Sequence, residues 1–207
     1  MIQAEVLTID HIIKKIKNGE IFEAVPIDYS FHLKIRDYIP YVCAAIHAGH
    51  NFRNNLKDKV VHSEYERWYE EDPHTDTFIS SMPLTIVGLD SRFEYDLNRS
   101  PEKCVYKDAW GKPVWKKPLS KSLEKESLKK HENFYKVVDA LIQYIEEKFG
   151  GCLVFDMHSY NFVRHQKEVP VFNIGTANVD ESRYKKAIDY WYEKLKSISI
   201  RSIESTT

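Results

Sequence analysis

Two histidines stand at the ends of apolar runs in this chain. His47 closes the run 41–46, and His158 follows the run 152–157. Each run has the length and the β-branched or aromatic content of a buried strand, so each imidazole is expected where a strand leaves the sheet for a loop. Chemistry in α/β proteins is usually located at such strand ends. The two histidines are therefore the first candidates for a functional site.

An acidic segment between these histidines offers a third ligand for a metal ion. Hydrolytic zinc sites commonly take three ligands from His, Asp and Glu and keep a fourth position open. Asp72 precedes a proline and has the pattern of a helix N-cap, so we expect Asp76, one turn further on, to be the ligand. Asp72 stays the alternative, because residues four apart share a helix face. Either histidine could also be an ordinary hydrogen-bonded imidazole.

A further carboxylate precedes the second histidine. Asp156 and His158 are two residues apart and therefore lie on the same face of the predicted strand. Asp156 could orient the imidazole by accepting a hydrogen bond from the ring nitrogen that does not bind the metal, as carboxylates often do for metal-binding histidines. The alternative is a buried aspartate that is simply hydrogen-bonded at the strand end.

Two arginines, Arg92 and Arg99, lie in an acidic stretch that follows another predicted strand. A guanidinium group binds a carboxylate through two parallel hydrogen bonds, so either arginine could hold an acidic substrate. The open alternative is an internal ion pair with Asp90, Glu94 or Asp96.

The elements that must position these side chains alternate between strands and helices. Strands are expected over residues 21–26, 31–35, 41–46, 84–89, 152–157 and 169–174. Helices are expected over 10–18, 64–71, 120–149 and 180–198, the third with a buried stripe of Leu128, Phe134, Val137, Val138, Leu141 and Ile145. Segment 101–119, with its prolines, tryptophans and lysines, predicts a long surface loop. The alternation predicts an α/β domain with a mixed, mostly parallel sheet.

Composition excludes several classes of partner. The 207 residues include 30 basic and 31 acidic side chains, and this balance gives no electrostatic reason to expect nucleic acid or an anionic membrane as a partner. No apolar stretch approaches the roughly 20 residues that span a bilayer. Three unpaired cysteines suit a reducing compartment, so a cytoplasmic location is expected. The expected partner is a small molecule, and the sequence does not specify an oligomeric state.

Four segments together resemble the N-formylglutamate amidohydrolase family. They are IHAGH at 46–50, EDPHTD at 71–76, DSRFEYDLNR at 90–99 and FDMHSY at 155–160. That family is similar in fold to zinc carboxypeptidases, and the resemblance extends from about residue 42 to 191. It implies one phosphorylase/hydrolase-like, three-layer α/β domain over residues 1–207, with a mixed, mostly parallel central sheet and one zinc ion.

The resemblance also implies roles for particular residues. His47, His158 and a carboxylate of 72–76 look like the zinc ligands. Asn98 and Arg99 match the family's clamp for the substrate carboxylate, with Arg92 in its Ser-Arg motif. The implied reaction is hydrolysis of the N-acyl amide of an acidic amino acid, such as N-formyl-L-glutamate.

Two positions depart from the carboxypeptidase pattern. That pattern places a zinc-binding glutamate three residues after the first histidine, where this chain has His50. It also carries the general-base glutamate on a late strand, which implies that this chain lacks a C-terminal segment. Glu204 is the only late carboxylate in a strand-like context and is our candidate base. The alternative function is a catalytically incomplete domain that binds an acidic small molecule or a protein partner through segment 106–117.

Overall fold

The computed structural model describes residues 4–162, 169–177 and 179–198. The chain divides into two compact units, Met1–Tyr160 and Asn161–Thr207. Within the second unit, helix α6 runs over Glu181–Lys196 with Asp180 as its N-cap, as predicted. The strand predicted over 169–174 is wrong, because these described residues form only bends and irregular backbone. The single hydrolase-like domain stays a prediction.

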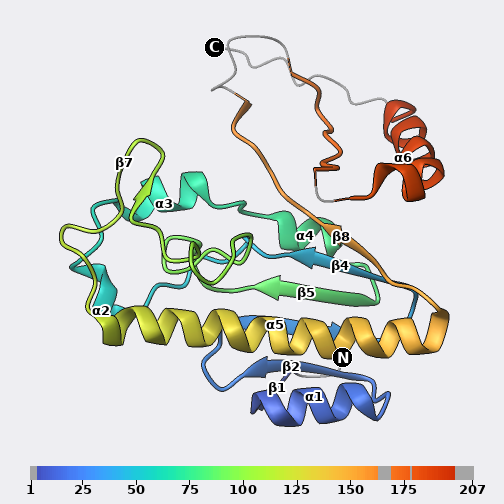
Figure 1. The fold of residues 1–207 in the computed structure, drawn as a ribbon, viewed down its shortest axis with the longest axis horizontal. Helices are drawn as coiled ribbons and strands as arrows, with labels where there is room; N and C mark the ends of the chain where they lie inside the picture. The colour runs from blue at the N-terminus through green and yellow to red at the C-terminus, as the bar shows by residue number, and fades with distance from the viewer. Residues whose placement is uncertain (1–3, 163–168, 178, 199–207) are drawn as a thin grey trace. The chain divides into compact units, whose positions relative to one another are not determined.

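A six-stranded sheet forms the centre of the first unit (Figure 1). Its order is β1-β2-β3-β5-β4-β8. The strands are β1 (Glu5–Leu7), β2 (Phe22–Pro26), β3 (Phe31–Ile35), β5 (Leu84–Gly88), β4 (Tyr41–Ala45) and β8 (Leu153–Asp156). The pairs β1/β2, β4/β5 and β4/β8 are parallel, and β2/β3 and β3/β5 are antiparallel. The α/β class and the mixed, mostly parallel sheet are therefore confirmed.

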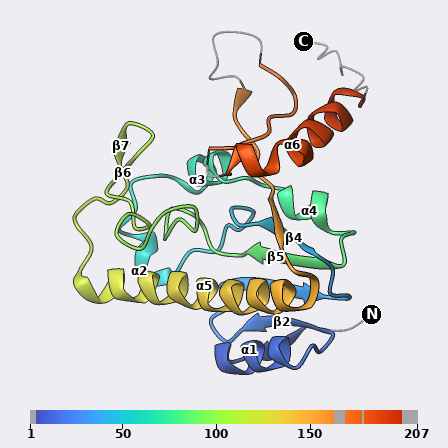
Figure 2. The ribbon, with the colours of Figure 1, turned by 45° about the vertical axis from the view of Figure 1, so that its right-hand side comes forward.

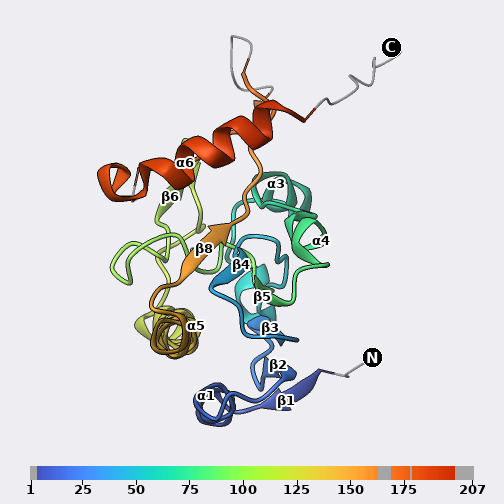
Figure 3. The same ribbon diagram turned by 90° about the vertical axis from the view of Figure 1, so that its right-hand side faces the viewer.

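Helices lie on both faces of this sheet. Figure 3 shows α1 (Ile9–Lys17) and α5 (Lys121–Phe149) on one side and α3 (Glu64–Glu70) and α4 (Thr75–Ile79) on the other. The short helix α2 (Asn54–Lys57) lies near the start of α5 (Figure 1). Helix α1 packs beside α5, as Figure 2 also shows. This is the three-layer arrangement that an α/β domain needs to bury both faces of its sheet.

The main core forms between α5 and the sheet. Phe134, Val137, Leu141 and Ile145 of α5 are buried there with apolar side chains of the central strands. Leu128 was predicted to belong to this stripe, but it is 37% exposed. On the first half of the helix the buried residues are instead Ser127 and His131, and both have polar side chains. The first half of α5 therefore covers polar groups rather than the apolar sheet.

The ends of the helices are set by local capping residues, and one N-cap differs from the predicted one. The Ser63 side chain and the Glu66 side chain form a reciprocal capping box at the start of α3. Gly150 ends α5 in the left-handed conformation with φ 80°, which glycine adopts without a steric penalty. The N-cap of helix α1 lies two residues before the predicted one, because Thr8 and not Asp10 accepts the capping hydrogen bond from His11.

Segment 101–119 is not purely a surface loop. It contains a short hairpin of β6 (Asp108–Ala109) and β7 (Lys112–Pro113). Val114 and Trp115 are buried in a second core cluster with Phe52, Leu56, Val60 and Phe93. The segment is therefore anchored to the body of the unit by its own apolar side chains.

None of the helices in the described ranges is long and apolar enough to cross a membrane.

Candidate metal centre

His47 lies two residues beyond the end of β4, in the loop where the sequence predicts it. Its side chain is 1% exposed. Its Nε2 lies 2.8 Å from Oδ1 of Asp96, and its Nδ1 is buried with no hydrogen-bond partner among the described residues. A buried nitrogen without a partner is costly, so it points to a function for that atom.

Two glycines hold the His47 loop tightly against β5. A Cβ atom on Gly49 would lie 2.1 Å from the carbonyl carbon of Leu89, and one on Gly88 would lie 2.3 Å from the carbonyl oxygen of Ile46. Both distances are far below van der Waals contact. The close approach of the two backbones therefore requires glycine at both positions and fixes where His47 emerges.

Asp72 is brought to His47 by the connection between α3 and α4. Its backbone N–H donates to the His47 carbonyl oxygen over 3.0 Å. Its Oδ2 lies 3.4 Å from His47 Nδ1 and 2.8 Å from His158 Nδ1, and its Oδ1 accepts from Ser159 Oγ over 3.2 Å. The carboxylate thus bridges the two histidines.

The predicted N-cap role of Asp72 is wrong. The residue before α4 is His74, which has φ 70° and makes no capping hydrogen bond with its side chain. The helix therefore begins later than predicted, which leaves the Asp72 side chain free for the histidines. Asp76, the ligand favoured from the sequence, lies exposed in the first turn of α4 and outside this group. The structure brings together Asp72, the alternative, and not Asp76.

His158 follows β8 by two residues and reaches the same edge of the sheet. Strands β4 and β8 are parallel, with Ala44 opposite Asp156, so both chains leave the sheet side by side. His158 Nε2 lies 2.8 Å from Asp156 Oδ2, and the two imidazole rings are 4.9 Å apart between centroids. Asp156 therefore occupies the orienting position that its spacing allows.

The donor set fits a metal ion such as zinc. Among the described residues, one ligand atom from each of His47, Asp72 and His158 forms a group in which all atoms lie within 4.8 Å of one another. Two imidazoles and a carboxylate are a common zinc ligand set that leaves a position open. Each imidazole turns Nδ1 toward Asp72 and gives Nε2 to a second aspartate, the arrangement that fixes a metal-binding tautomer.

Charge interactions stabilise the ionised carboxylates. Burial alone raises the pKa of Asp72, but the hydrogen bond with His158 and the interaction with nearby His47 outweigh it and hold that pKa well below its usual range. Hydrogen bonds with Asp156 and Asp72 raise the pKa of His158 to about 9. A cation that takes His158 as a ligand must therefore displace a proton from it.

Asp96 is the residue that the sequence reasoning missed as part of the site. It is fully buried and lies against His47 Nε2, Arg92 Nη2 at 2.7 Å, the Tyr106 hydroxyl and the Asn98 backbone N–H at 2.6 Å. Burial raises its pKa, but His47 and Arg92 together hold it well below the usual range. The available signal was a carboxylate placed between two arginines after a buried strand.

The predicted substrate-binding residues divide into two kinds. Arg92 is engaged internally, since its Nη2 donates to Asp96 and its guanidinium lies 5.3 Å from the Trp110 ring centroid. The internal ion pair left open by the sequence is therefore present for Arg92. Asn98 and Arg99 are exposed, and the Arg99 guanidinium donates to the Asn98 carbonyl oxygen over 2.7 Å.

Two other residues singled out from the sequence, His50 and Glu204, are not part of the His47 group among the described residues. His50, which replaces the glutamate of the carboxypeptidase pattern, turns Nδ1 to Glu71 and lies 3.6 Å from Glu64 through Nε2. Glu71 also accepts a hydrogen bond from Ser91 Oγ, and neither His50 nor Glu71 belongs to the donor group of His47, Asp72 and His158. Glu204, the predicted general base, lies outside the described residues.

Comparison with known proteins gives one match. A family model described as N-formylglutamate amidohydrolase matches residues 39–200. The match contains all four segments whose resemblance was noted from the sequence. No curated protein and no solved structure matches the chain significantly. Because the family model matches most of the 207 residues, this chain belongs to the N-formylglutamate amidohydrolase family.

Proposed function

We propose that this protein is a zinc-dependent amidohydrolase that cleaves the N-formyl amide of an acidic amino acid such as N-formyl-L-glutamate. The observation that carries the proposal is the convergence of donor atoms from His47, Asp72 and His158 within 4.8 Å of one another. Family membership supports amide hydrolysis as the reaction type. The unpartnered Nδ1 of buried His47 supports a ligand role for that atom.

His47, Asp72 and His158 would hold the zinc ion. When bound, zinc supplies Lewis-acid chemistry, which polarises a scissile carbonyl and makes water a better nucleophile near neutral pH. Asp96 and Asp156 accept hydrogen bonds from the Nε2 atoms and so keep the Nδ1 lone pairs directed at the site. These two aspartates therefore act as positioning residues in the proposal.

Substrate binding is assigned to the exposed polar residues beside this centre. Asn98 and Arg99 follow Asp96 directly, and neither side chain is buried. A guanidinium fork suits the α-carboxylate of an acidic amino acid, so we assign that group to Asn98 and Arg99. Arg92 pairs with Asp96, and we assign it to holding Asp96 against His47. Glu204 remains the proposed proton acceptor for the attacking water.

The direct test is release of formate from N-formyl-L-glutamate by the purified full chain. We expect release that is lost after dialysis against a chelator and restored by zinc. Asp72→Asn removes a charged ligand oxygen and should abolish release, whereas Asp76→Asn, an exposed matched control four residues away, should leave it unchanged.

Two results would contradict the proposal. One is undiminished formate release in the chelated protein. The other is loss of release in Asp76→Asn with full release in Asp72→Asn. Binding of N-formyl-L-glutamate without any turnover would instead support the alternative, a binding module for an acidic small molecule.

A further inference from the structure

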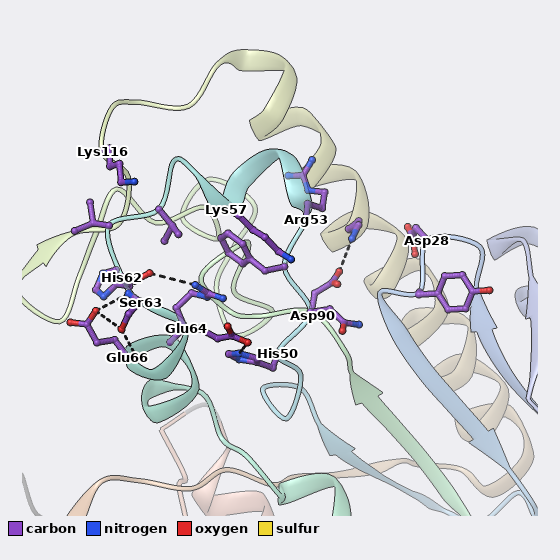
Figure 4. Close-up of a pocket in the computed structure, with 17 residues that line it drawn as sticks. Asp28, His50, Arg53, Lys57, His62, Ser63, Glu64, Glu66, Asp90 and Lys116 are labelled. Atoms are coloured by element: carbon purple, nitrogen blue, oxygen red, sulfur yellow. Dashed lines mark hydrogen bonds and ion pairs between the residues drawn. The ribbon is translucent and has the colours of Figure 1, made fainter.

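A cavity of about 900 Å³ lies beside α2, α3 and the connection between them (Figure 4). Its wall includes His50, Phe52, His62 and Arg67, with Lys57 and Lys116 also lining it. None of these residues belongs to the His47 group. The cavity and that group nevertheless use the same two chain segments: His50 follows His47 by three residues, and Arg67 precedes Asp72 by five.

Arg67 is a buried guanidinium that forms no ion pair with any described residue. Arg67 is only 6% exposed, and its guanidinium lies 4.4 Å from the centroid of the Phe52 ring. Its one hydrogen bond to a described residue is a long one, from Nη1 to the His62 carbonyl oxygen at 3.4 Å. Its Nε is buried and has no hydrogen-bond partner in the part of the chain that the structure describes. Burial accordingly lowers the pKa of Arg67.

The carboxylates nearest to Arg67 are already used or exposed. Glu71 and Glu64 act on Arg67 electrostatically. Glu71 gives one oxygen to His50 and the other to Ser91, and the Glu64 side chain is 82% exposed. Both carboxylates therefore favour the charged guanidinium electrostatically, but neither forms an ion pair with it.

A second arginine that lines the same cavity, Arg53, has hydrogen-bond and ion-pair partners within the chain. Arg53 donates to Glu94 Oε1 over 2.5 Å, to Ser127 Oγ over 2.6 Å and to the Leu123 carbonyl oxygen over 3.1 Å, and it also pairs with Glu126. Buried charged groups are normally bonded in this way, because an unpaired buried charge is strongly unfavourable. Arg67 departs from that rule inside the same cavity.

His62 provides a second unpartnered group in the same wall. Its side chain is buried, and Nε2 has no hydrogen-bond partner among the described residues. The His62 ring packs against Phe93, with 4.7 Å between ring centroids. One cavity thus presents two buried side chains with nitrogens that the described chain leaves unbonded.

We propose that Arg67 binds the side-chain carboxylate of the acidic substrate in this cavity. A carboxylate matches the planar guanidinium fork and supplies the missing counter-charge. This inference rests on the proposed hydrolysis for the identity of the ligand, and it assigns the second carboxylate of the substrate to a residue separate from Asn98 and Arg99. Arg67 is then a residue that determines specificity for an acidic over a neutral side chain.

The test compares the binding of L-glutamate and L-glutamine to the full chain by titration calorimetry. The two ligands differ only at the side-chain group, and neither is hydrolysed. We expect the protein to bind L-glutamate roughly 10- to 100-fold more tightly than L-glutamine, the range for a hydrogen-bonded charged pair. Arg67→Met should bring this ratio to about 1, while Arg67→Lys, which keeps the charge but loses the fork, should give an intermediate ratio.

Lys116→Met is the matched control. It removes one positive charge from the wall of the same cavity, at a position well apart from His50 in Figure 4, and should leave the ratio unchanged. The ratio of two dissociation constants does not depend on the fraction of active protein, so a partly unfolded variant still gives an answer. A wild-type ratio near 1, or an undiminished ratio in Arg67→Met, would overturn the proposal. The calorimetric comparison requires no turnover. Absence of formate release would therefore contradict the proposed hydrolase function but would not decide whether Arg67 binds the side-chain carboxylate.

Discussion

Two buried clusters of charged residues in this protein differ in how completely their atoms are bonded. In the cluster at the first half of α5, Arg53 pairs with Glu94, and Lys130 pairs with Asp90, which also accepts from the Tyr95 hydroxyl over 2.7 Å. In the metal centre, Nδ1 of buried His47 forms no hydrogen bond with a described residue and lies 3.4 Å from Asp72 Oδ2. The buried polar atoms of the first cluster are hydrogen-bonded, as is expected of a structural cluster. The second cluster leaves a nitrogen available to bind a ligand, as is expected of a metal site.

This difference separates stability from function. Residues of the saturated cluster should govern folding and leave metal binding intact, since all their bonds are internal. Residues of the metal centre should govern metal binding. Mutations in the two clusters should therefore have separable effects on stability and on metal binding.

The largest effect is expected in the saturated cluster. Arg53→Met leaves buried Glu94 without its main partner, and removal of one member of a buried pair costs roughly 3 to 5 kcal/mol. We expect the free energy of unfolding in urea to fall by that amount, with zinc content per folded chain unchanged. Loss of zinc from folded Arg53→Met would break the separation between the two clusters.

A smaller effect is expected where the His47 loop meets β5. Gly49→Ala places a methyl group against the Leu89 backbone, and overpacking of this kind costs roughly 1 to 3 kcal/mol. Gly151→Ala is the matched control, because a Cβ at Gly151 meets nothing within 4 Å. Thermal unfolding should show a lower midpoint for Gly49→Ala only, and equal midpoints for the two variants would argue against the close packing of this loop.

Asp96→Asn tests the metal centre through its positioning carboxylate. The variant retains the shape of the side chain but weakens the interaction that fixes the His47 tautomer. Loss of such a partner typically lowers metal affinity 10- to 100-fold, which competition with a zinc-binding dye can measure. An affinity equal to that of the unaltered protein would show that Asp96 has only a structural role.

The smallest effect concerns pH and the saturated cluster. Burial, together with Glu94, raises the pKa of Asp90 to about 6, although Lys130 opposes the shift. The folded state therefore binds this proton more tightly than the unfolded state. The resulting stability is fully present below the ordinary aspartate pKa and is lost as pH rises through about 6.

Asp90→Asn removes this titration. From pH 4 to 7 the unaltered protein should lose roughly 2 kcal/mol of unfolding free energy relative to Asp90→Asn, measured by urea denaturation at each pH. A constant difference across that range would show that Asp90 does not titrate as its burial requires.

Periodicity predicts the framework of this protein well, because most elements have a local cause. The strands 22–26, 31–35 and 84–88 follow from short apolar or alternating runs, and the helix 121–149 follows from its apolar stripe and terminal glycine. Leu128 was misplaced because the first half of that helix covers polar groups. There Ser127 bonds to Arg53, and His131 bonds to the Arg99 carbonyl oxygen.

The site was predicted only in part, because its contacts join distant segments. The spacing of strand ends was enough to pair His47 with His158. It was not enough to choose between Asp72 and Asp76, because the hydrogen bond from the Asp72 N–H to the His47 carbonyl sets the path of the chain. Asp96 meets His47 across 49 positions of sequence, so no local pattern marks it as the partner.

The central claim is that His47, Asp72 and His158 hold one metal ion. Metal analysis of the purified protein, beside the double variant His47→Ala/His158→Ala, tests it most directly. We predict close to one zinc per chain in the unaltered protein and almost none in the double variant, with both proteins folded by circular dichroism. Full zinc occupancy in the folded double variant would contradict the claim.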